Sequence, residues 1–161
     1  MRRLALAAAC CAALVGAQSA RADGDPASDY LLVQHVFVPF EGAVAAKQQH
    51  ALMREVATVN KAGFAIRVAV IFSNYDLGSV TSLWRKPQTY ARFLGVELSF
   101  VYKQRLLVVM PNGFGFNWVR HPSKDGYAVL SGVPVQPGTT GLISSATVAV
   151  QKLAAAAGVK T

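Results

Sequence analysis

AIRVAVIF (Ala65–Phe72) and RLLVVM (Arg105–Met110) are the two stretches that decide the fold. Each is a dense apolar run, too short for a helix that could pack by itself, and each is followed by a turn signal. Asn74–Gly78 follows the first run, and Pro111–Gly113 follows the second. We therefore predict two strands that are buried on both faces, the kind found inside a parallel sheet.

Helices are predicted around these strands from apolar residues that recur at three- and four-residue spacing. They cover Val44–Ala62, Pro87–Leu98 and a last segment that runs from Thr139 or Thr140 to Ala157. A further short strand is predicted within Leu32–Phe40. This order predicts an α/β fold, a three-layer α/β/α sandwich with a small, mainly parallel central sheet built from right-handed crossovers.

The segment between Met110 and Thr139 is rich in glycine and proline, which predicts loops, with a strand near Tyr127–Val133 as an option. It contains four aromatic residues, Phe114, Phe116, Trp118 and Tyr127. We expect them to be buried at the sheet edge, because aromatic side chains contribute heavily to small cores. The alternative is an exposed surface for a partner or a carbohydrate. Trp84, in the loop before Pro87, is the better candidate for an exposed anchor.

The first 22 residues have the three regions of a secretory signal peptide. Arg2 and Arg3 precede an apolar run of 14 residues, Leu4–Ala17, and the small-residue site Ala20–Ala22 follows it. We predict cleavage after Ala22, then an N-terminal arm over 23–30, of which Asp23–Asp29 is a solvated linker, and one domain over 31–158. A retained anchor is the alternative, although a spanning helix needs about 20 apolar residues.

Removal of the signal changes the composition of the chain. Both cysteines leave with it, so the mature domain has no thiol chemistry and no disulfide. Loss of three arginines takes Lys and Arg from 16 to 13 against 8 acidic residues, so the formal charge falls from +8 to +5. This moderate charge favours an anionic envelope polymer, lipid headgroups or an envelope protein as partner over nucleic acid. No second apolar run in the mature chain reaches transmembrane length.

Four short motifs resemble the TPM domain family. Asp29-Tyr30 stands where that family begins with an Asp-containing motif, and AIRVAVIF matches its first core strand. Tyr90-Ala91 matches the Tyr-Ala pair of its second helix. RLLVVM with Gly113-Phe114-Gly115 is similar to its third strand and the nearby Gly-aromatic-Gly.

The resemblance implies an α/β/α module of exported or membrane-anchored proteins. Members have been linked to acid phosphatase activity and to assembly or repair of membrane complexes. The sequence departs from the family in two places. Pro111 and Gly113 follow the third strand almost at once, where the family has a charged second strand of a hairpin. The family's downstream membrane helix and glycine-rich tail are missing.

Oxygen-bearing residues are predicted to gather beyond the carboxyl ends of the strands, where open α/β sheets bind ligands. Our hypothesis is a site for Ca²⁺ or Mg²⁺ formed by Asp76, Asn74 and either Glu41 or Asp29, since these cations prefer oxygen ligands. The alternative is that Asp76 caps the following turn and that Glu41 is solvated.

Basic residues provide a second hypothesis. Arg85 and Lys86 precede the helix that starts at Pro87, and Arg92 lies within it. With Lys103 and Arg105 they could hold a phosphate or an anionic polymer, helped by the free amides at the helix start. The alternative is an ordinary soluble surface.

The motifs of several enzyme classes are missing. His35, His50 and His121 have no metal-ligand spacing, and the sequence has no Gly-x-Ser-x-Gly elbow and no P-loop lysine. We therefore expect a secreted, non-enzymatic binding or accessory domain at the cell envelope. A metal-assisted phosphatase is the alternative, in which a cation would activate the attacking water. An inert structural protein is the third class.

Overall fold

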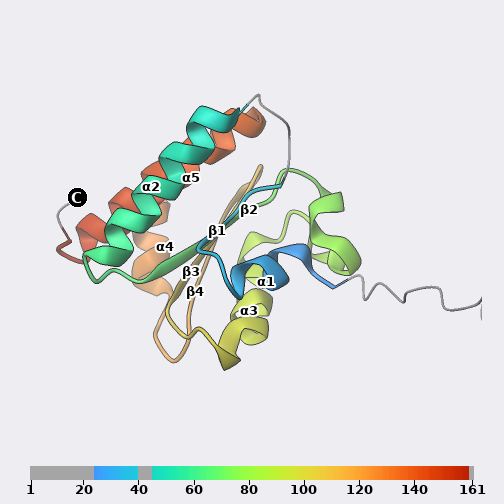
Figure 1. Ribbon diagram of the computed structural model, residues 1–161, viewed down its shortest axis with the longest axis horizontal. Coiled ribbons are helices and arrows are strands. Elements are labelled where there is room, and N and C mark those ends of the chain that lie inside the picture. Colours follow the sequence, from blue (N-terminus) through green and yellow to red (C-terminus); the bar gives the residue numbers. More distant parts are fainter. Residues whose placement is uncertain (1–23, 40–44, 160–161) are drawn as a thin grey trace, which may run out of the picture.

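The computed structural model describes residues 24–39 and 45–159 (Figure 1). The predicted signal peptide, its cleavage position and Glu41 lie outside the described residues. Within them, no helix combines the length and the apolarity that crossing a membrane requires.

A four-stranded sheet with the order β1-β2-β3-β4 forms the centre of the molecule. Its strands are β1 (Val36–Phe37), β2 (Ile66–Val70), β3 (Arg105–Met110) and β4 (Gly113–Trp118). The first three are parallel and β4 is antiparallel to β3. Val68 pairs with Leu107, so the two decisive apolar runs lie side by side as predicted.

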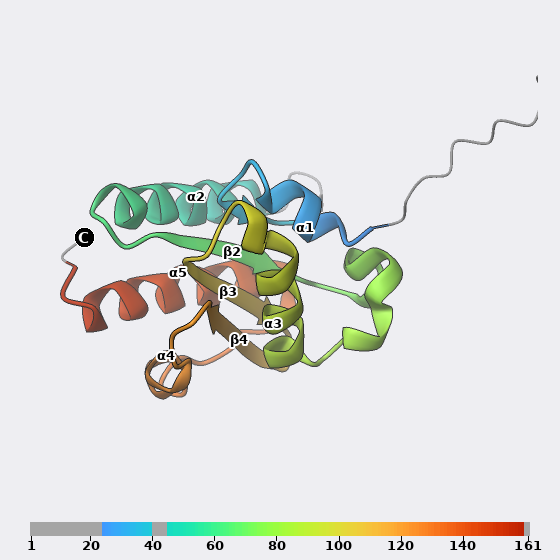
Figure 2. The same ribbon diagram turned by 90° about the horizontal axis from the view of Figure 1, so that it is seen from below.

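Helices cover both faces of the sheet, which confirms the predicted α/β/α sandwich (Figures 1 and 2). One face carries α2 (Ala46–Lys61), α4 (Lys124–Leu130) and α5 (Gly138–Ala156). The other carries α1 (Pro26–Leu31), the 3-10 segment η2 (Asn74–Leu83), α3 (Pro87–Glu97) and the 3-10 turn η3 (Leu98–Phe100).

The alternation of strand side chains divides the core in two. Val68 and Leu107 point to the α2 and α5 face, whereas Ala69 and Val108 point to the α3 face, and all four are fully buried. Both faces of β2 and β3 are therefore apolar, which explains why these strands are continuous hydrophobic runs and not alternating ones.

The prediction that every crossover is right-handed is wrong for one of the two. The connections β1-α2-β2 and β2-α3-β3 step across the sheet in the same direction, yet α2 and α3 lie on opposite faces. Two parallel crossovers with the same step and opposite faces have opposite hands. One is therefore left-handed, the rare alternative.

The hairpin partner β4 was predicted as a loop because its two glycines signalled a turn. The structure uses Gly115 instead for close packing. A Cβ at this position would collide with the backbone carbonyl of Pro87 and lie 2.9 Å from the Ala91 Cβ, so α3 rests directly on β4. The Gly113–Gly115 motif thus lies in the second strand of a hairpin.

Other local predictions also need correction. The optional strand near Tyr127–Val133 is largely the helix α4, and the predicted strand Leu32–Phe40 shortens to β1. The N-terminal arm is not a solvated linker from Asp25 onward, since α1 begins at Pro26 and buries Ala27 completely. Trp84 is half-buried against the α3-side core and is not a fully exposed anchor.

Candidate functional site

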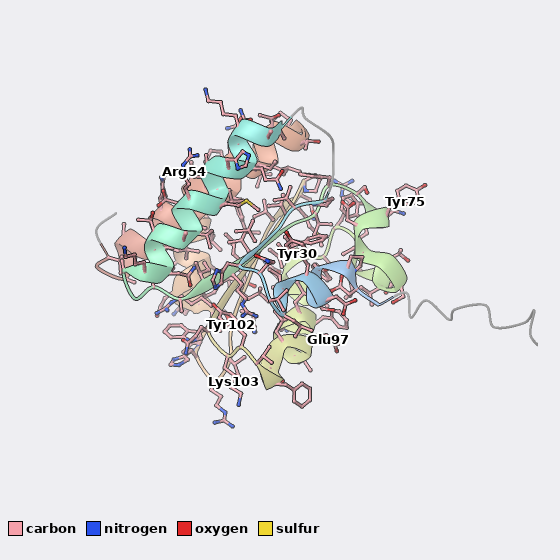
Figure 3. All side chains as sticks on the ribbon, viewed as in Figure 1. Tyr30, Arg54, Tyr75, Glu97, Tyr102 and Lys103 are labelled. Carbon is pink, nitrogen blue, oxygen red and sulfur yellow. The ribbon has the colours of Figure 1, made fainter. Side chains whose placement is uncertain are left out.

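The strand ends form two opposite rims of the sheet, because the three parallel strands all begin at one rim and end at the other. We call each rim an edge. We call the first the amino edge; it comprises residues 32–35, 61–65, 96–105 and 118–125. The second, the carboxyl edge, comprises residues 71–78, 85–89 and 111–114. Figure 3 shows Lys103 of the amino edge at the bottom of the view and Tyr75 of the carboxyl edge at the upper right.

The structure uses Asp76 to cap a helical segment at the carboxyl edge. Its Oδ2 accepts hydrogen bonds from the backbone amides of Phe72 and Ser73, both at 2.7 Å. Ser73 and Asp76 form a reciprocal capping box at the start of η2. Asp76 therefore matches the capping alternative.

Of the other proposed metal ligands, Glu41 lies outside the described residues, and the remaining two are exposed side chains. Asn74 is exposed at the start of η2, and Asp29 is exposed on α1. In residues 24–39 and 45–159, no three His, Cys, Asp or Glu side chains are grouped so as to hold a metal ion.

The proposed anion contacts are only partly brought together. Arg85, Lys86 and Asn112 line a hollow of about 340 Å³ at the start of α3. The Asn112 Nδ2 donates a hydrogen bond of 2.7 Å to the carbonyl oxygen of Arg85, which fixes this part of the hollow. Arg92 lies outside it, in neighbouring hollows beside Asn117.

Lys103 and Arg105 do not join this group either. Both belong to the amino edge, because they stand before and at the start of β3. Four of the five basic residues of the sequence hypothesis are therefore divided between the two edges of the sheet, and Arg92 lies between these edges within α3.

Arg105 is the centre of a stack of planar side chains at the amino edge. Its guanidinium carbon lies 4.3 Å from the ring centre of Phe64 and 3.9 Å from that of Trp118. The His121 ring lies 3.8 Å from the Trp118 ring at an interplanar angle of 23°. Since Arg105 and His121 are both within 4 Å of the Trp118 ring, they cover its opposite faces.

The backbone puts these residues in place. Arg105 and Trp118 are direct cross-strand partners at the open end of the hairpin, and Phe64 stands just before β2. Cross-strand neighbours have side chains close enough for such stacking. Tyr127 attaches α4 to the neighbouring part of β4. Its hydroxyl accepts a hydrogen bond from the Phe116 amide and donates one to the Phe116 carbonyl, both at 3.0 Å.

The stack opens into a cavity of about 250 Å³. Its walls are mostly apolar and come from the stack, from Phe116, from α4 and from the end of α5; they include Val129, Leu153, Ala156 and Ala157. The pKa of Arg105 lies below its ordinary value, because burial lowers it and the nearby Tyr102 phenol offsets only part of this shift. No carboxylate is among the groups that shift this pKa. Asp125 also lines the cavity. The site thus presents a positive charge inside an apolar wall.

Arg67 makes contacts at the same edge, on the α3 side of the sheet. The Arg67 guanidinium lies 4.2 Å from the Tyr102 ring centre and donates a hydrogen bond to the carbonyl oxygen of Leu31. The Tyr102 hydroxyl donates to the carbonyl oxygen of Arg105 at 3.0 Å. These contacts join the end of α1, β2 and the α3–β3 connection.

Apolar side chains protrude from the amino edge. Eight large apolar residues are exposed in the described part of the chain, and five of them belong to this edge: Leu32, Val33, Val96, Phe100 and Val101. Phe100 is 93% exposed. Basic side chains accompany them, since Lys61, Lys103, Arg120 and Lys124 are exposed at the same edge, against the exposed acids Glu97 and Asp125.

Sequence reasoning missed the stack, although it singled out Arg105 and Trp118 separately. The positions of Phe64 and Arg105 at the starts of two parallel strands were a usable signal, because such positions meet at one edge. His121 carried no signal, since its place depends on the unpredicted strand β4. Compared with known proteins, the chain matches no protein-family model, no curated protein and no solved structure.

Proposed function

We propose that this protein is a secreted, non-enzymatic accessory domain of the cell envelope, similar to TPM domains, that docks on an anionic membrane surface through its amino edge. The observation that carries the proposal is the coincidence of protruding apolar side chains and cations on one edge of the sheet.

The apolar part of this edge has a large area to bury. Val33 is 78% exposed, Phe100 93% and Val101 61%. Full burial of one such side chain is worth roughly 1.5–3 kcal/mol, so partial insertion of two or three would give weak, reversible binding. Exposed apolar side chains that gather on one surface are typical of membrane or protein contacts.

The charge of the edge favours an anionic surface over a neutral one. Four exposed cations stand beside two exposed acids, a local excess of positive charge. Each Lys or Arg near an anionic bilayer contributes about 1 kcal/mol, and salt screens this attraction within about 10 Å. Apolar insertion and charge attraction then act on the same face, as in interfacial membrane binding.

Two further features support an accessory role at the envelope. The N-terminal segment has the charge and apolar pattern of an export signal. The α/β/α sandwich is the fold that the TPM resemblance implies. Tyr90, which belongs to one of the motifs shared with that family, is fully buried and donates a hydrogen bond to Asp25. This gives it a structural role.

Vesicle sedimentation tests the proposal. Purified protein is mixed with vesicles of phosphatidylcholine alone or with a third of phosphatidylglycerol, at low and at high salt. We expect sedimentation with the anionic vesicles only, falling with salt concentration. The double substitution F100S/V101S should abolish it.

Tyr75→Ser is the matched control, because Tyr75 is 86% exposed but belongs to the carboxyl edge. It should bind vesicles as the unchanged protein does. Equal loss in Y75S, equal binding to neutral vesicles, or no binding at all would each overturn the proposal. Binding to an anionic polymer or a protein but not to vesicles would replace the membrane by that partner.

A further inference from the structure

We infer that the cavity around Arg105 is a binding site for a small organic carboxylate with an apolar body, such as an aryl-substituted or short aliphatic acid. The cavity lies at the amino edge, beside the membrane contact proposed above, but Phe100 and Val101 do not line it.

The Arg105 guanidinium is held between two aromatic side chains. Phe64 and Trp118 lie against it at 4.3 and 3.9 Å. A guanidinium with rings against it still has N–H groups for hydrogen bonds, and these match the two oxygens of a carboxylate. The rings hold the plane of the fork before a ligand arrives, which reduces the entropy lost on binding.

The charge of Arg105 favours an anionic ligand. Burial lowers the pKa of Arg105, so its positive charge is less well solvated than in water, and no carboxylate is among the groups that shift it. An incoming anion would supply the missing partner. Because Asp125 lines the same cavity, it disfavours ligands with several negative charges, which favours a monocarboxylate over a phosphate.

The volume and lining of the cavity favour a small ligand with an apolar body. Beyond Arg105 its walls are aromatic and aliphatic, from Phe116 and Trp118 to Val129 and Leu153. Ligand pockets usually measure roughly 300–1,000 Å³, and this cavity of about 250 Å³ lies just below that range. It therefore suits a ligand of one ring or a short chain.

A ligand can reach the cavity from solvent, and Trp118 fluorescence can report its binding. His121 lies on Trp118 and is itself exposed, so the stack reaches from the cavity to solvent. The chain has two tryptophans, and Trp118 is the one that lines the cavity. Trp84→Phe would leave Trp118 as the only indole fluorophore, which gives a direct signal for occupancy.

The test compares 3-phenylpropionate with its neutral analogue 3-phenylpropan-1-ol, by calorimetry on the unchanged protein and by Trp118 fluorescence in W84F. We expect the acid to bind at least about tenfold more tightly than the alcohol, as for a charged hydrogen-bonded pair. Arg105→Gln should remove this preference. Arg85→Gln, which removes a cation from the carboxyl edge, should leave it unchanged.

Equal affinity for acid and alcohol would overturn the inference, as would no binding of the acid at 10 mM, roughly the weakest affinity of interest. The acid–alcohol comparison needs no variant, so it stays decisive even if R105Q fails to fold. The double variant F100S/V101S should still bind the acid. Loss of vesicle binding with retained acid binding therefore separates this site from the proposed membrane contact.

Discussion

The Tyr90 hydroxyl donates a hydrogen bond of 2.6 Å to the carboxylate of Asp25, and both residues are buried between α1 and α3. This contact joins positions 65 residues apart and holds the N-terminal segment on the domain. The second Asp25 oxygen, Oδ2, is buried and has no hydrogen-bond partner among the described residues.

The Asp25 carboxyl should make stability depend on pH. Burial raises its pKa from 3.8 to about 6, and the bond from Tyr90 lowers it only in part. The folded state then binds the proton more tightly than the unfolded state. This stabilisation is complete below pH 3.8 and is lost as the pH rises through about 6.

Asp25→Asn removes this titration. Relative to D25N, the unchanged protein should lose roughly 2 kcal/mol of unfolding free energy between pH 4 and pH 7, because most of the effect of the raised pKa falls in this interval. Urea unfolding at several pH values measures it. Parallel pH profiles of the two proteins would show that Asp25 does not carry the effect.

Tyr90→Phe should destabilise the domain more at pH 7 than at pH 4. It removes the hydroxyl that donates to the Asp25 carboxylate, and a buried group that loses its partner costs about 1–3 kcal/mol, more when it is charged. Because burial also raises the Tyr90 pKa, the hydroxyl remains a donor throughout this range. An equal cost at both pH values would contradict this account.

Gly115→Ala tests the contact of α3 with β4. The new methyl group would meet the Pro87 carbonyl, which is backbone and cannot move without shifting the helix. We expect a loss of about 3 kcal/mol or more, at the upper end for overpacking. Gly63→Ala is the control: nothing lies within 4 Å of its Cβ, so only its positive φ of 92° is strained, at about 1 kcal/mol.

Asp76→Ala tests the structural role of this carboxylate. Loss of the bonds to the Phe72 and Ser73 amides should cost about 1–2 kcal/mol, the usual value of a cap. Thermal unfolding with and without millimolar Ca²⁺ addresses the metal hypothesis, and we expect no Ca²⁺-dependent shift in the unchanged protein. A shift that disappears in D76A would restore the metal site.

The central strands could be predicted because their burial is visible in local composition. Apart from Arg67 and Arg105, the residues of Ala65–Phe72 and Arg105–Met110 are apolar at consecutive positions, as is typical of a strand buried on both faces. The α3 start at Pro87 and the α5 end before Gly158 also follow from local rules, since proline suits a first helical turn and Gly158 has a positive φ.

The parts that failed depend on contacts distant in sequence. Gly115 signals a turn until α3 is known to pack on it, and α1 resembles a solvated arm until Tyr90 is placed opposite Asp25. The predicted convergence of the basic residues was wrong for the same reason: Arg85 and Arg105 are both basic residues near strands, and only the topology assigns them to opposite edges.

Amide hydrogen exchange with and without anionic vesicles tests the proposed membrane contact most directly. The account predicts that vesicles slow exchange in residues 96–104 and 119–122 and leave residues 72–78 and 111–114 unchanged. Slower exchange at the carboxyl edge, with the amino edge unaffected, would contradict it.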